Sequence, residues 1–226
     1  MSGQQIAAPP QKTMIRVWNP VIRICHWTLV AAFAIAWLTE DDLLTAHVWA
    51  GYAAAGAVLV RLTWGIIGPE QDDLSNFLRP PGEVLRYLGD ALRLRSKRYL
   101  GHSPAGAVMG LALLVSMAAT AGTGMMVLAQ EKHAGPLASW FGPSAAQAGP
   151  GLIAPARSGG DDDDRGSGGE GHEGGESGIG EVHEFFANLT LILVLLHVTG
   201  VALASLSHRE NLVRGMITGD KPADAP

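Results

Sequence analysis

The chain has 226 residues, of which 47% are hydrophobic and only 16% are charged. A soluble domain usually carries about 25% charged residues, so this composition excludes an ordinary soluble domain and favours an integral membrane protein. The net charge of −5 conceals a segregation of the two signs along the chain. The one cysteine, Cys25, excludes an intrachain disulfide, and because it lies in an apolar segment we interpret it as a small buried hydrophobe.

Four segments are long and apolar enough to cross a bilayer, which requires about 20 helical residues. They are residues 21–38, 46–68, 104–128 and 182–206. The predicted fold is therefore an all-α integral membrane protein, a bundle of four transmembrane helices. We expect one membrane domain over residues 14–219, with tails at residues 1–13 and 220–226, in contact with the lipid bilayer and with no nucleic-acid partner.

Lysine and arginine predict the orientation of the bundle, because they concentrate in cytoplasmic loops. The first outer loop, TEDD, has no basic residue, and the second and much longer one has three. Basic residues instead precede the first span, separate the second from the third and follow the fourth: Lys12, Arg16, Arg23, Arg79, Arg86, Arg93, Arg95, Lys97, Arg98, Arg209, Arg214 and Lys221. Both termini are thus expected in the cytoplasm. A cleaved signal peptide ending near residues 34–36 is the weaker alternative, because cleavage would remove His26.

Two connections between the spans have distinctive compositions. The second outer loop contains SGGDDDDRGSGGEGHEGGESGIG, a Gly-rich acidic stretch that cannot bury enough apolar surface to fold alone. We predict disorder over residues 144–179. The inner loop predicts an amphipathic helix after Pro81, with Val84, Leu85, Leu88 and Leu92 at helical spacing.

Four of the eight histidines lie at matching depths in the predicted spans. His183 and His197, both in the fourth span, are fourteen residues apart. This separation corresponds to about 21 Å of helix rise and leaves the two side chains within about 40° of one face. His47 matches His183 in depth toward the outer side, and His26 approximately matches His197 toward the inner side.

Two imidazoles that face each other across a helix bundle are what a six-coordinate b-type haem requires, one for each face of the porphyrin. The predicted axial pairs are His47 with His183 and His26 with His197, giving two non-covalent haem b groups. Gly51 and Gly200 lie near these histidines and would leave room for the ring. For any single histidine an interhelical hydrogen bond is the simpler explanation, but four at matched depths favour haem.

The other histidines, His102, His133, His172 and His208, lie outside this pattern and are not predicted as ligands. Haem propionates need cationic or hydrogen-bonding partners, and Arg16, Arg23 and Arg61 are placed near the inner pair. Snorkelling of these side chains to lipid headgroups explains their positions equally well.

The motifs RVWNPVIRICHWTLVAAFAIAWLTED, HVWAGYAAAGAVLVRLTWGIIGP, RYLGHSPAGAVMG and HEFFANLTLILVLLHVTGVALASLSHRENLVRGMITG together resemble the bacterial cytochrome b561 family. This family includes the b-type cytochrome subunit of nickel–iron hydrogenases. The resemblance covers nearly all of residues 14–219 except the outer linker. It implies a four-helix, di-haem cytochrome of the bacterial inner membrane that passes electrons between the quinone pool and a redox partner, such as a c-type cytochrome or a hydrogenase. Its ligand pattern falls on His26, His47, His183 and His197.

Two other functions stay open from the sequence. The first is a quinone-linked oxidoreductase that acts directly on superoxide, as implied by superoxide oxidases that the chain also resembles. The second, a divalent-cation carrier, is disfavoured because the spans contain only Glu184 as a carboxylate, at an outer end. The acidic outer loop would steer a basic partner, an effect that salt weakens.

Overall fold

The computed structural model describes residues 14–40, 43–93, 99, 101, 103–141, 178–208 and 210–222. Four helices in this part of the chain are long and apolar enough to cross a membrane: α1 (Pro20–Leu38), α2 (Leu44–Ile67), α4 (Pro104–Glu131) and α6 (Gly178–His208). They confirm the four predicted spans. The largest differences from the predicted bounds are in α4, which continues to residue 131, and in α6, which begins at residue 178.

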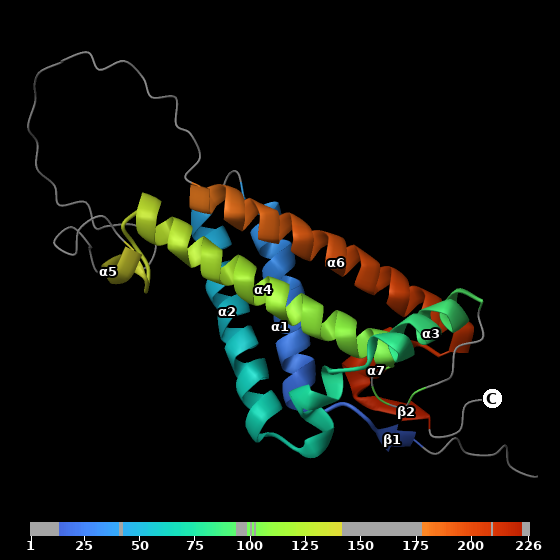
Figure 1. Ribbon diagram of the computed structural model, residues 1–226. Coiled ribbons are helices and arrows are strands. Elements are labelled where there is room, and N and C mark those ends of the chain that lie inside the picture. Colours follow the sequence, from blue (N-terminus) through green and yellow to red (C-terminus); the bar gives the residue numbers. More distant parts are fainter. Residues whose placement is uncertain are drawn as a thin grey trace, which may run out of the picture.

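The helices are arranged as two antiparallel pairs. α1 packs along α2, α4 packs along α6, and α4 also contacts α2 (Figure 1). A cluster of Ala32, Ala54, Val58, Leu114 and Met117 fills the space where α1, α2 and α4 meet. Small side chains at this junction allow the helices to approach closely, as is common in membrane bundles.

Local sequence explains where two of these helices begin. α1 starts at Pro20, and the Asn19 side chain accepts a hydrogen bond of 2.9 Å from the Val21 amide. α4 starts at Pro104, and the Ser103 hydroxyl accepts one of 3.1 Å from the Gly106 amide. Proline at the first helical position and a polar side chain before it are a common start signal.

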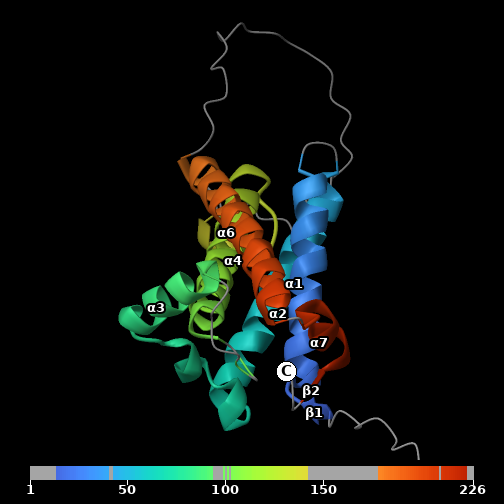
Figure 2. The ribbon, with the colours of Figure 1, turned by 90° about the vertical axis from the view of Figure 1, so that its right-hand side faces the viewer.

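Short elements close one end of the bundle, which we call the strand end. They are η1 (Glu70–Asp72), η2 (Leu74–Phe77), α3 (Pro81–Leu92), α7 (Leu212–Thr218) and an antiparallel pair of strands, β1 (Met14–Arg16) and β2 (Asp220–Pro222). Figure 2 shows the strands below α1, with α7 beside it. α3 confirms the helix predicted after Pro81.

At the opposite end, which we call the loop end, α1 connects to α2, and the short helix α5 (Ala138–Phe141) follows α4. The prediction of disorder over residues 144–179 was wrong at its last two positions, which belong to the first turn of α6. Helix propagation from the apolar segment outweighs the local glycine content there. The rest of that stretch lies outside the described residues.

Candidate functional site

The first histidine pair lies at the loop end and joins α2 to α6. The ring centroids of His47 and His183 are 6.2 Å apart, with an angle of 86° between the ring planes. We call this the loop-end pair.

Hydrogen bonds fix the tautomer of both imidazoles in the loop-end pair. His47 Nδ1 is 2.9 Å from the carbonyl oxygen of Ala36, and His183 Nδ1 is 3.1 Å from that of Thr120. A carbonyl oxygen can only accept, so each Nδ1 carries the proton and donates it. Each Nε2 therefore keeps a free lone pair, which is the state that binds a metal.

The second pair lies nearer the strand end and joins α1 to α6. The ring centroids of His26 and His197 are 6.5 Å apart, with 57° between the ring planes. We call this the strand-end pair. Nδ1 of His26 is buried and has no hydrogen-bond partner among the described residues, unlike the corresponding nitrogens of the loop-end pair.

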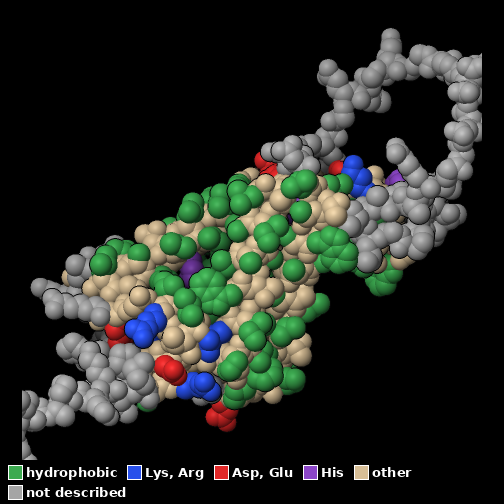
Figure 3. Space-filling view, turned by 180° about the vertical axis from the view of Figure 1, so that it is seen from behind, with side chains coloured by type: hydrophobic (Ala, Val, Ile, Leu, Met, Phe, Trp, Pro, Cys, Tyr) green, Lys and Arg blue, Asp and Glu red, His purple; other side chains and the backbone are tan. Residues whose placement is uncertain are grey.

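Both pairs span a gap between helices. α6 packs on α4, yet in the described part of the chain it has no extensive contact with α1 or α2, the helices that carry the opposing histidines. A side chain added at Gly51 or at Gly200 would meet no atom within 4 Å, so the space near each pair is open. Figure 3 shows the molecule from behind, and on that side a histidine side chain is visible between apolar side chains.

The separation of the rings distinguishes two explanations. A direct N–H···N hydrogen bond places the nitrogens about 2.9 Å apart and the ring centroids about 5.2 Å apart. A metal bound to both imidazoles at about 2.0–2.1 Å, the bond length in zinc sites, places the centroids about 6.3 Å apart. The observed 6.2 and 6.5 Å are too long for the first arrangement and are compatible with the second.

A bare metal ion fits these residues poorly. A structural or catalytic metal usually takes three or four protein ligands. Among the residues that the structure describes, no group of three or more His, Cys, Asp or Glu side chains could hold an ion. Two opposed imidazoles with open space between helices instead fit an iron whose other ligands come from a porphyrin.

Two of the three arginines expected near the inner pair, Arg61 and Arg23, have protein partners. Arg61 is 8% exposed and donates to the Asp72 carbonyl oxygen over 3.4 Å, with its guanidinium 5.2 Å from the Phe77 ring centroid. The Asp72 carboxylate accepts a hydrogen bond of 3.0 Å from the Trp64 indole. Arg23 donates to the carbonyl oxygen of Ile217 in α7. Asp72 and Trp64 thus form a buried polar cluster with Arg61 that the sequence did not predict.

The remaining predicted residues are separate from the two pairs. Cys25 is 5% exposed, as expected for a buried hydrophobe. His133 lies in the turn after α4, with φ of 50°, and His208 is the last residue of α6. His102 and His172 lie outside the described residues.

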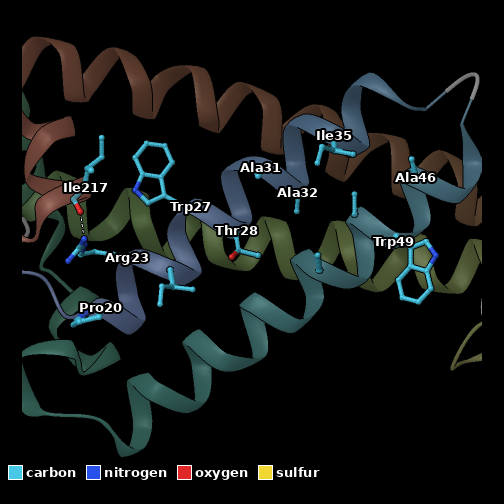
Figure 4. A pocket seen from close by; sticks show the side chains of 13 residues that line it. Pro20, Arg23, Trp27, Thr28, Ala31, Ala32, Ile35, Ala46, Trp49 and Ile217 are labelled. Carbon is cyan, nitrogen blue, oxygen red and sulfur yellow. Dashed lines mark hydrogen bonds between the residues drawn. The ribbon is translucent and has the colours of Figure 1, made fainter.

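A groove of about 840 Å³ runs between α1, α2 and the end of α7. Its walls are mostly apolar, with Ala31 and Ala32 along its length and Arg23 at its strand end (Figure 4). Trp27 also lines the groove, and its ring meets the His26 ring edge-on at a centroid distance of 5.2 Å. The groove is therefore separated from the strand-end pair by one aromatic side chain.

The model of a family described as prokaryotic cytochrome b561 matches residues 17–219. The chain belongs to the prokaryotic cytochrome b561 family. Family membership identifies it as a multi-pass bacterial membrane protein, a b-type cytochrome that binds haem b and transfers electrons. No curated protein and no solved structure matches the chain.

Sequence reasoning on this cytochrome missed the groups that hold the histidines. Thr123 Oγ1 lies 3.2 Å from His183 Nδ1, and the other two acceptors are backbone carbonyls of Ala36 and Thr120. Carbonyl groups leave no signal in a sequence. Thr120 and Thr123 were visible, together with Ser116, as hydroxyl side chains in an otherwise apolar span.

Proposed function

We propose that the cytochrome binds two haem b groups, one at each histidine pair, and carries electrons between the quinone pool and a redox partner protein. The observation that carries this proposal is the presence of two imidazole pairs between α6 and the helices opposite it, with 6.2 and 6.5 Å between ring centroids. His47 and His183 would hold one haem, and His26 and His197 the other.

The haem supplies the one-electron redox chemistry, and the protein supplies ligation, orientation and a low-dielectric surrounding. The loop-end imidazoles are held in the binding tautomer by carbonyl acceptors, so no proton has to move before they bind. α6 carries one histidine of each pair and therefore sets the spacing between the two sites. Fourteen residues of helix correspond to about 21 Å.

The groove of α1, α2 and α7 is the surface that we propose for the quinone. Its apolar walls suit an isoprenoid tail, and the Arg23 guanidinium and the Thr28 hydroxyl can donate to quinone carbonyl oxygens. Contact between Trp27 and His26 brings the groove next to the strand-end pair. A quinol bound there would give up two electrons and two protons in becoming a quinone.

A variant that fills the groove tests this proposal. Ala31→Trp places an indole in the groove wall, and Ala34→Trp places the same side chain at an exposed position of α1 outside the groove. We expect quinol-driven reduction of the cytochrome in liposomes to slow at least tenfold in Ala31→Trp and to stay unchanged in Ala34→Trp. Dithionite should reduce both proteins fully, because it does not need the groove. Equal quinol rates in the two variants would exclude this groove as the quinone site.

Electron transfer to a redox partner protein is tested with the same liposomes. We expect the quinol-reduced cytochrome to pass electrons to an added oxidised c-type cytochrome, followed by the absorbance of the acceptor. Added superoxide serves as the competing reactant, and haem reduction by superoxide that outpaces quinol would instead support the oxidoreductase alternative.

A further inference from the structure

The two histidine pairs differ in how their imidazoles are held. In the loop-end pair both Nδ1 atoms have acceptors, the Ala36 carbonyl for His47 and the Thr120 carbonyl for His183. In the strand-end pair Nδ1 of His26 is buried and has none. The same ligand type therefore occurs in two different hydrogen-bonding environments.

Thr123 strengthens this difference. Its hydroxyl donates to the Ala119 carbonyl over 2.8 Å, so the lone pairs of Oγ1 face His183 Nδ1 at 3.2 Å as a second acceptor. His183 thus shares one proton between the Thr120 carbonyl and the Thr123 hydroxyl. Two acceptors on one N–H withdraw the proton further from the ring than one does.

An acceptor on the far nitrogen makes an imidazole a better electron donor to its metal. Stronger donation stabilises ferric iron more than ferrous iron, which lowers the reduction potential of the site. Loss of such an acceptor has the opposite effect. The loop-end pair is therefore built for a lower potential than the strand-end pair.

Nearby charge does not reverse this order. Arg61 is a buried cation of α2, but the buried Asp72, which lies against it, offsets its charge. Glu184 follows His183 directly and is exposed, so solvent screens it, and its negative charge acts in the same direction as the hydrogen bonds. Arg23 lines the groove beside the strand-end pair, and its positive charge would raise the potential there. These charges therefore act in the same direction as the hydrogen bonds to the ligands.

We propose that Thr123, with the carbonyls of Thr120 and Ala36, sets the loop-end site at a lower reduction potential than the strand-end site. This inference rests on the proposed function, since it requires a haem at each pair. Transfer of one electron from the loop-end site, which is oxidised, to the strand-end site, which is reduced, is then downhill, so this step favours electron flow toward the groove proposed for the quinone, and flow away from the groove depends on an acceptor of higher potential. Thr123 acts through His183 and is a positioning residue.

The experiment is an anaerobic redox titration of the purified protein, followed by its haem absorption, with haem counted per chain. We expect two one-electron steps in the wild-type protein. Thr123→Val should move the lower step to higher potential and leave the upper step in place. Thr123→Ser, which restores an acceptor, should return the lower step to its wild-type value.

Thr190→Val is the matched control. The wild-type Thr190 hydroxyl bonds to Thr120 Oγ1 and to the Phe186 carbonyl, and to neither imidazole of the loop-end pair. Both steps should stay where they are in this variant. His26→Ala assigns the two steps independently, because loss of a strand-end ligand should remove the upper step and leave the lower one. An unchanged lower step in Thr123→Val, a shifted upper step, or survival of the upper step in His26→Ala would overturn the inference. Fewer than two haems in the wild-type protein would instead refute the proposed function.

Discussion

Individual residues around His183 determine whether its ring can reach the loop-end site. A Cβ added at Gly124 would lie 2.9 Å from His183 Cε1, closer than real side chains approach. Glycine at this position leaves room for the ring, in addition to the hydrogen bonds that orient it. The same helix contains Gly122, where an added Cβ would meet nothing within 4 Å.

These two glycines give a prediction with a built-in control. Gly124→Ala should push the His183 ring out of line and lower haem occupancy of the loop-end site at least twofold, measured as haem per chain after purification. Gly122→Ala should keep full occupancy and be slightly more stable, because alanine favours a helix by about 1 kcal/mol over glycine. Equal haem content in the two variants would show that the His183 ring tolerates the added methyl.

At the scale of elements, α6 is the helix on which both pairs depend, and it is held mainly by α4. Thr190, which is fully buried, lies 3.1 Å from Thr120 across this contact, hydroxyl to hydroxyl. The fourth span was predictable because its apolar length and its two histidines fourteen residues apart follow from helix geometry. The start of α6 at residue 178 was not predictable, since the preceding glycines favour a loop by composition.

The hydrogen-bonding environment of the two histidine pairs could not be predicted from the sequence either. Periodicity places His26 and His183 at different depths, but only the packing of α6 on α4 brings Thr120 and Thr123 to His183. In the part of the chain that the structure describes, no such acceptor lies at Nδ1 of His26. The pairing of histidines is therefore readable from spacing, whereas the difference between the pairs depends on tertiary contacts.

Removal of the Thr190 hydroxyl tests the α4–α6 contact. Thr190→Val should reduce the free energy of unfolding by about 0.5–1.5 kcal/mol, the net value of a buried hydrogen bond. Thr199→Val is the control, since the exposed Thr199 hydroxyl bonds only to the Leu195 carbonyl of its own helix. Unfolding in a detergent titration measures both, and an equal effect would mean that the contact between the hydroxyls adds no stability.

At the scale of the whole molecule, the basic residues predict that the strand end faces the cytoplasm. Labelling by a membrane-impermeant maleimide tests this orientation. Ser75→Cys lies at an exposed position in η2 at the strand end, and Trp140→Cys replaces a side chain that is 82% exposed in α5 at the loop end. We expect intact spheroplasts to label Trp140→Cys at once and Ser75→Cys only after lysis.

The wild-type protein serves as the background for this experiment, because its one cysteine, Cys25, is buried. The opposite labelling order would place both termini outside. It would also reverse the side of the membrane toward which the strand-end pair lies.

The central claim is that each histidine pair binds one haem, and haem stoichiometry in single-pair variants tests it most directly. Haem b extracted from the purified wild-type protein should amount to two per chain. His47→Ala and His197→Ala should each retain one, with a reduced-minus-oxidised spectrum from the surviving pair. One haem or none in the wild-type protein, or two in either variant, would contradict the assignment of the two pairs.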